Sequence, residues 1–352
     1  MHPYSSRLIF SVVVSISIIM AMGQSPRLHA APAEGVAPPR PPAEKAAAGA
    51  ELKNVVTIEV KDGYRHITSN GIPDHPRGQF PGPGNPNTVS AQSYKLRVPV
   101  KPKLLEKSAP PQRGMLAGVA LNGVVFDPGT AEAWKNDPSL GWRQEAISPT
   151  TVKGLKMGLD KSNAHVQPNG AYHYHALPEG LLEKLLAAKG VKDGEAMIQV
   201  GWAADGFPIY DAHCYSKADD AKSPLKHLRS SYKLKTGERP GGEKGPGGKH
   251  DGTYTADFEY VAGAGDLDEC NGRTGVTPEF PEGTYYYVVT DEFPFIHRQL
   301  KGVADPSFQK NDRRPGGPGG PGGPGGPGGQ RPPGGPGPRP GPPLEGPPPP
   351  PR

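Results

Sequence analysis

The sequence lacks several features that would assign a function directly. No G-x-S-x-G motif is present, and no serine stands in an evident set with histidine and aspartate, which argues against nucleophilic hydrolysis. The glycine clusters lie in proline-rich segments rather than directly after strands, so no phosphate-binding loop is indicated. Strands alternating with helices, the sign of a parallel doubly wound sheet, are also missing.

Positive charge is missing from the central part of the chain. The net charge is +5 over 352 residues, but residues 1–50 carry +2 and residues 313–352 carry +4, which leaves the part between them at −1. A nucleic-acid-binding domain normally has a basic patch on its folded part. Nucleic acid is therefore not an expected partner, although the basic tail could contact an anionic surface or polymer loosely.

Only one apolar run is long, and it lies near the N-terminus. Arg7 precedes an apolar run of about fifteen residues at 8–22, which is typical of a secretory signal peptide and marginal for a membrane span. We expect a signal peptide over 1–23, with cleavage near residue 30 as the alternative, and no transmembrane span in the mature chain. An uncleaved anchor is the competing interpretation. The predicted location is the periplasm or the extracellular space.

Cysteine is scarce, and Cys214 and Cys270 are the only two in the chain. An oxidising compartment favours a disulfide between them, which would close a long loop and stabilise the fold by roughly 2–4 kcal/mol. Two free thiols, or one thiol serving as a metal ligand, are the alternatives.

Glycine and proline, with 49 and 46 residues, are concentrated at the two ends of the chain. Residues 24–50 form an Ala/Pro-rich linker, and residues 313–352 are almost wholly proline, glycine and arginine. We expect the tail to be disordered, because its PGG units have too few prolines for a stable triple helix. The remaining residues, 51–312, are enough for one domain with a core of its own.

Short alternating segments predict a strand-rich domain. Asn122-Gly123 and Ala204-Asp205-Gly206 lie between apolar runs, which is typical of β-hairpins. Residues 178–190 begin with proline and end with glycine around helically spaced leucines, and they predict the main helix. The expected fold is mainly β, as a β-sandwich-like or α+β fold with short helices. Further strands are expected at 54–60, 94–100, 254–261 and 284–290, one helical turn within 130–136, and mostly loop at 63–87 and 240–249.

Three of the eleven histidines, His165, His173 and His175, lie within eleven residues. On an extended strand His173 and His175 point to the same face with Cβ atoms roughly 6–7 Å apart, whereas Tyr172 and Tyr174 point to the other face. A turn at 168–170 could return His165 to the pair. Imidazoles at this spacing can share one cation such as zinc or copper. The alternative is a partly buried strand whose histidines only pack and form hydrogen bonds.

Other polar residues could complete such a site or form a different one. The segment 266–272, DLDECNG, has carboxylates at alternate positions as calcium loops do, but it lacks their twelve-residue ligand pattern. Calcium is therefore less expected than zinc or copper, and a polar loop is the preferred interpretation. Candidates for a further ligand or an outer partner of the histidines are Asp160, Asp205, Asp211 and His213.

Four blocks of sequence occur in order, and together they resemble the bacterial YHYH-domain family. They are AHVQPNGAYHYHALP at 164–178, GWAADGFPIYD at 201–211, the segment 266–295, and RQLKG at 298–302, with the naming motif at 172–175. The resemblance covers about 90–302 and implies a secreted protein of a family with no established activity. Some family members resemble an internal duplication with a second YHYH-like strand. Here the corresponding segment is Tyr285-Tyr286-Tyr287-Val288, without histidine, and a cysteine often found near the position of Gln299 is absent.

Three functions are compatible with these observations. The first is an exported transition-metal-binding protein of the cell envelope or the extracellular space. The second is a metal-dependent hydrolase or oxidoreductase, in which the metal activates water or carries an electron. The third is a structural or adhesion module in which the histidines bind no metal.

Overall fold

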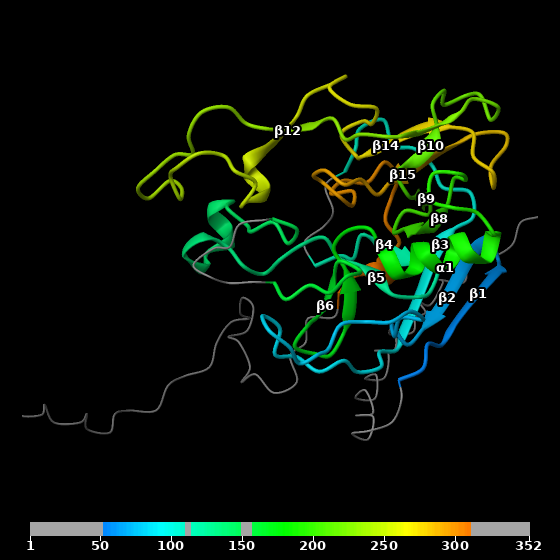
Figure 1. Cartoon of the computed structure of the whole chain (residues 1–352), viewed down its shortest axis with the longest axis horizontal. Helices are drawn as coiled ribbons and strands as arrows, with labels where there is room; N and C mark the ends of the chain where they lie inside the picture. Colours follow the sequence, from blue (N-terminus) through cyan, green and yellow to red (C-terminus); the bar gives the residue numbers. More distant parts are fainter. Residues whose placement is uncertain (1–51, 110–113, 149–156, 311–352) are drawn as a thin grey trace, which may run out of the picture. The chain divides into compact units, whose positions relative to one another are not determined.

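An eight-stranded sheet organises the described part of the chain (Figure 1). The structure is a computed structural model, and it describes residues 52–109, 114–148 and 157–310. The predicted signal peptide, linker and tail lie outside these residues. In spatial order the strands are β14 (Gly272–Gly275), β15 (Thr284–Val288), β9 (Pro208–Tyr210), β8 (Gln199–Ala203), β4 (Gly118–Ala120), β5 (Val125–Phe126), β7 (Tyr172–Tyr174) and β6 (Ala164–Val166).

Smaller elements surround this sheet. Helix α1 (Glu179–Lys189) is the one α-helix of the described residues, and none of the helices in these ranges is long and apolar enough to cross a membrane. The short 3-10 helices are η1 (Trp134–Asn136), η2 (Pro138–Leu140), η3 (Thr255–Asp257) and η4 (Pro306–Phe308). The other strands form the sheet β1 (Val56–Lys61), β2 (Tyr64–Ser69), β3 (Tyr94–Pro99) and the pairs β10 (His213–Tyr215) with β11 (Leu225–His227) and β12 (Tyr232–Leu234) with β13 (Phe258–Tyr260).

The mainly β class is confirmed, and so are both predicted hairpins and the helix. β4 and β5 pair around Gly123, which adopts a φ of +81° as the turn requires, and Gly206 does the same between β8 and β9 with a φ of +95°. The prediction of mostly loop at 63–87 holds outside β2, which occupies residues 64–69. Residues 254–261 contain η3 before the short strand β13 rather than one continuous strand.

The eight-stranded sheet consists of two halves with the same arrangement of strands. In each half a hairpin, β4–β5 or β8–β9, is extended by a parallel strand, β7 or β15, which pairs in turn with an antiparallel edge strand, β6 or β14. β4 and β8 join the halves as antiparallel neighbours. The register also agrees, since His165 lies opposite His173 in β6–β7 and Arg273 lies opposite Tyr286 in β14–β15.

Side chains repeat between the halves as well. Asp160 Oδ1 accepts hydrogen bonds from the backbone amides two and four residues later, and Asp268 Oδ1 does the same before β14. The hydroxyl of Tyr172 donates to Asp160 at 2.7 Å, and that of Tyr285 donates to Asp268 at 2.9 Å. The chain therefore contains one structural unit twice, as the resemblance implied.

The two faces of this sheet differ in what they bury. Four tyrosines belong to the main hydrophobic core: Tyr172 and Tyr174 of the first half, and Tyr285 and Tyr287 of the second. For Tyr172 and Tyr174 this agrees with the expectation that they point to the face opposite the histidines. On the other face, Tyr286 belongs to a smaller apolar cluster around Cys214.

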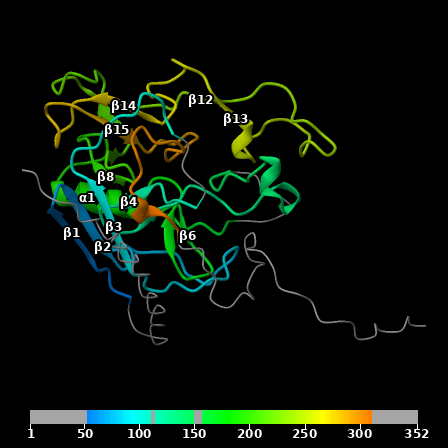
Figure 2. The same ribbon diagram turned by 180° about the vertical axis from the view of Figure 1, so that it is seen from behind.

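Away from the sheet, both views place the teal segment 130–148 beside the segment around η3 (Figures 1 and 2), where Trp142 and Tyr254 have ring centroids 5.8 Å apart.

Candidate metal centre

The β6–β7 hairpin brings together the three histidines of the sequence motif. His165 lies at the centre of β6, directly opposite His173 in β7, and not in a loop before that strand. The predicted turn forms, with the Gly170 amide donating to the Gln167 carbonyl at 2.8 Å. The three imidazole centroids are 4.7 Å apart in every pair, and one ligand atom from each ring lies within 4.8 Å of the other two.

Backbone carbonyls fix the orientation of two of these rings. His165 Nδ1 lies 2.6 Å from the Met157 carbonyl, and His173 Nδ1 lies 3.2 Å from the Ala171 carbonyl. A carbonyl only accepts, so both Nδ1 atoms carry the proton and both Nε2 atoms keep a free lone pair. This is the arrangement that metal-binding histidines commonly have, with one ring nitrogen held by the protein and the other free.

The third ring has no such support. His175 Nδ1 is buried and has no hydrogen-bond partner among the described residues, whereas its Nε2 lies 3.1 Å from Nε2 of His165. Because His165 Nε2 has a lone pair, His175 Nε2 must donate a proton to it when no cation is present. The cluster therefore contains one buried nitrogen without a partner and one contact that a shared cation would replace.

Burial keeps His173 and His175 uncharged. His173 is 2% exposed and His175 is 1% exposed, whereas His165 is partly exposed. Burial lowers the pKa of His173 to about 4, against the opposing effect of the Asp127 carboxylate. Burial, and then the neighbouring histidines, lower the pKa of His175 well below its usual value. Both rings are thus neutral at neutral pH, which is the form that binds metal.

Charged residues that the sequence did not single out surround the histidines. Asp127 follows β5 and forms an ion pair with Lys310 at 2.6 Å, and its carboxylate also accepts from Gln167 at 2.8 Å. Arg298 forms an ion pair with buried Glu145 at 2.7 Å. The charges of Arg298 and Lys310 contribute to the low pKa of His175, which places them within electrostatic reach of the cluster. Each comes from a distant part of the chain, so no local motif marks it.

The further candidates from the sequence lie elsewhere. Asp160 lies on the tyrosine side of the strand, where it accepts from Tyr172. Asp205 accepts hydrogen bonds from the Tyr287 hydroxyl and from the Gly302 amide, and burial raises its pKa. Asp211 and His213 lie together in a second group with Asp193. None of the four therefore joins the group of histidines.

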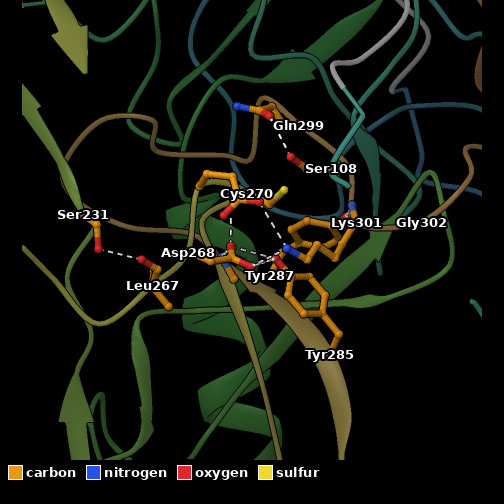
Figure 3. A network of polar contacts seen from close by, with 12 residues as sticks. Ser108, Ser231, Leu267, Asp268, Cys270, Tyr285, Tyr287, Gln299, Lys301 and Gly302 are labelled. Carbon is orange, nitrogen blue, oxygen red and sulfur yellow. Dashed lines mark hydrogen bonds and ion pairs between the residues drawn. The ribbon is translucent and has the colours of Figure 1, made fainter. Parts of the chain in front are cut away.

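The carboxylates of the segment considered for calcium already have partners within the protein (Figure 3). Asp268 accepts from the Tyr285 hydroxyl and lies 3.4 Å from the Lys301 ammonium, which also forms an ion pair with Glu269 at 3.2 Å. Asp266 forms an ion pair with Lys226 at 2.5 Å. These carboxylates satisfy turns and lysines, which agrees with the interpretation as a polar loop.

The predicted disulfide is not formed in this structure. Cys214 and Cys270 are both buried free thiols, and they belong to different hydrophobic clusters. Cys214 Sγ lies 3.4 Å from the Asp211 carbonyl instead. Burial raises the pKa of both thiols, that of Cys270 to about 12, so neither is a thiolate ready to bind metal at neutral pH.

The second half of the sheet has no histidine at the equivalent positions. Arg273 takes the place of His165, Tyr286 that of His173 and Val288 that of His175. The Arg273 guanidinium donates from Nε to the Tyr286 hydroxyl at 2.6 Å and from another nitrogen to the Tyr215 carbonyl. The positive charge of Arg273 thus lies on this side of the second half, at the place where the first half has its three imidazoles.

The fold and the cluster define a class: a mainly β protein with a repeated sheet unit and a buried group of three histidines in its first half. A family model described as "YHYH protein" matches residues 95–302, and the chain belongs to this family. Neither the curated proteins nor the solved structures that were compared give a significant match.

Proposed function

We propose that this chain is an exported metal-binding protein that holds one transition-metal ion between His165, His173 and His175. The observation that carries the proposal is the mutual distance of 4.7 Å between the three ring centroids, in a group in which one ligand nitrogen of each ring lies within 4.8 Å of the other two. Export is proposed from the expected signal peptide at 1–23, and N-terminal sequencing of the mature protein would test it.

The arrangement is poorly explained by packing alone. Two of the three N–H groups already donate to backbone carbonyls, so the remaining ring nitrogens have three lone pairs and only one N–H donor among them. A cation would use three lone pairs at once and would replace the contact between the Nε2 atoms of His165 and His175.

Zinc and copper are the proposed ions. Imidazole nitrogen suits both, and bonds of about 2.0–2.1 Å from three rings would fit a common centre after small ring movements. A hard ion such as calcium requires oxygen ligands, which this group does not supply.

Metal analysis of the purified, untagged protein tests the proposal, with His173→Ala as the site variant. His297→Gln is the matched control, because His297 is an equally buried histidine outside the group. We expect wild type and His297→Gln to bind zinc or copper at the histidine group, and His173→Ala to bind one equivalent less with unchanged circular dichroism. A wild-type protein that binds neither ion at micromolar concentration would support the structural or adhesion module instead.

A metal-dependent hydrolase or oxidoreductase is the second candidate. It is favoured by one observation: the described residues contribute three ligands and no fourth His, Cys, Asp or Glu to the group. Three protein ligands and an open position are typical of catalytic zinc. Asp127 and Glu145 are buried carboxylates in the same region and are the candidate proton acceptors. Cobalt substitution tests this candidate, since an open position gives a spectrum that changes when azide is added.

A further inference from the structure

A second group of ligand residues lies at the C-terminal end of α1, apart from the histidine cluster. Asp193, Asp211 and His213 each offer one ligand atom, and these atoms lie within 4.8 Å of one another. His213 Nδ1 lies 3.2 Å from a carboxylate oxygen of Asp193 and 3.2 Å from one of Asp211. One ring nitrogen therefore faces two carboxylates at once.

A second imidazole and a third carboxylate adjoin this group. His227 lies opposite His213 in the β10–β11 pair, with ring centroids 4.8 Å apart. His227 Nε2 lies 3.2 Å from a carboxylate oxygen of Asp291, which follows β15. Two imidazoles and three carboxylates thus come together from four segments: the turn after α1, the β9–β10 connection with β10, strand β11, and the loop after β15.

Negative charge exceeds positive charge at this place. Asp211 is 1% exposed, and one of its oxygens accepts from the Ile198 amide at 3.1 Å, so the carboxylate is held rigidly. The pKa of nearby Glu179 is raised, first by burial and then by Asp291, Asp193 and Glu183. The ion pairs of these Asp residues involve histidines alone, and no lysine or arginine pairs with them among the described residues.

We propose that Asp193, Asp211 and His213 form a second divalent-cation site, with His227 and Asp291 at its edge. Mixed carboxylate and imidazole ligands suit zinc, and the site requires His213 to be neutral so that Nδ1 can bind the ion. The ion takes the place of the proton that His213 otherwise shares with the two carboxylates.

The position of the site indicates a structural role. A bound ion connects the turn after α1 with the segment 211–213 of the second half, and it neutralises carboxylates that otherwise repel each other. An ion that binds only the folded chain raises the free energy of unfolding by RT ln(1 + [ion]/Kd). Zinc at this site therefore raises the melting temperature.

The experiment compares zinc binding and thermal unfolding of the full mature chain with four variants. Asp193→Asn and His213→Gln remove ligands of the second site, and Asp193 is 61% exposed, so its variant is expected to fold. Asp219→Asn removes the same charge from an exposed position on another loop and serves as the control. His173→Ala removes the histidine cluster independently of this site.

We expect about two zinc ions per wild-type or Asp219→Asn chain. Asp193→Asn and His213→Gln each lose one equivalent together with at least half of the zinc-dependent rise in melting temperature. His173→Ala should still bind the zinc ion at Asp193, Asp211 and His213. This zinc ion is also expected if the proposed histidine centre binds no metal, so the two proposals can fail separately. The proposal is overturned if Asp193→Asn and His213→Gln bind as much zinc as wild type and show the same thermal shift, which would mean that these groups form only histidine–carboxylate ion pairs.

Discussion

Buried histidines recur in this fold, and burial lowers the pKa of three of them, His173, His175 and His297. His297 illustrates this outside the group of three histidines: it stacks on Tyr287 with ring centroids 4.1 Å apart, and its Nε2 lies 2.9 Å from the Ala117 carbonyl. Burial lowers its pKa to about 4 from 6.5. His297 therefore binds a proton at a lower pH in the folded protein than in the unfolded chain.

The pH dependence of stability follows from this difference. As pH falls below 6.5 the unfolded chain binds a proton at residue 297, whereas the folded chain does not until about pH 4, so stability is lost in this range. For His297 alone the loss between pH 7 and pH 5 is about 2 kcal/mol. His297→Gln keeps a donor for Ala117 without titrating, and we expect its stability to fall by that much less in urea titrations at the two pH values. If wild type and His297→Gln lost the same stability between pH 7 and pH 5, His297 would not be a source of the pH dependence.

The two thiols provide a prediction about reactivity. Cys214 and Cys270 are both 0% exposed, and burial raises the pKa of each. We expect neither to react with an aromatic disulfide reagent in the native protein, and two thiols per chain to react after unfolding in guanidinium without reductant. Protein recovered from an oxidising compartment is the informative sample, because no reactive thiol after unfolding would mean that a disulfide does form.

At the scale of elements, the β6–β7 hairpin sets the position of His165. Its turn depends on Gly170, which has a φ of +85° and leaves no room for a side chain, since an added Cβ would lie 1.9 Å from Ser90 Oγ. Ser90 in turn donates its amide to the Gly170 carbonyl at 2.9 Å. The hairpin and the loop before β3 are therefore closely packed at this point.

Substitution of two glycines separates conformational strain from steric conflict. Gly190, at the end of α1, also has a positive φ of +67°, but an added Cβ there would have no atom within 4 Å. We expect Gly190→Ala to lower the free energy of unfolding by about 1 kcal/mol, from backbone strain alone. Gly170→Ala should lower it by about 3 kcal/mol, because overpacking is added, and should weaken metal binding. Equal effects in urea denaturation would show that Ser90 moves away freely.

Local signals predicted elements whose structure is determined locally. Asn122-Gly123 marked the β4–β5 hairpin because the turn needs a positive φ, and the Pro and Gly at the ends of α1 marked its limits. β6 and β14 contain only three and four residues and exist because they pair with β7 and β15, so their own sequences carry little signal. The three histidines were found because they are close in sequence. Asp127, Arg298 and Lys310 were not, because only the folded chain brings them near.

At the scale of the whole molecule, the repeated unit has two different roles. Asn122 and Asp205 occupy the same place in their hairpins, and each bonds to the equivalent tyrosine hydroxyl: Asn122 to Tyr174 at 2.9 Å and Asp205 to Tyr287 at 2.5 Å. The core side of the unit is thus kept in both halves. On the other side, the first half has three histidines and the second has an arginine bonded to a tyrosine. If the histidine group binds metal as proposed, the first half of the sheet provides that site, whereas the equivalent positions of the second half support the fold.

Substitutions at equivalent positions of the two halves test this division. His165→Ala should remove metal from the histidine group and change stability little in the absence of metal, because His165 is partly exposed. Arg273→Ala should leave metal binding at that group unchanged. It should lower the free energy of unfolding by about 2–3 kcal/mol, because the Tyr286 hydroxyl and the Tyr215 carbonyl lose a charged donor. Calorimetric zinc titration and urea denaturation of both variants measure the two properties separately. If Arg273→Ala instead lost metal as completely as His165→Ala, the two halves would have to act on one site, and the second half would belong to the metal centre rather than to its support.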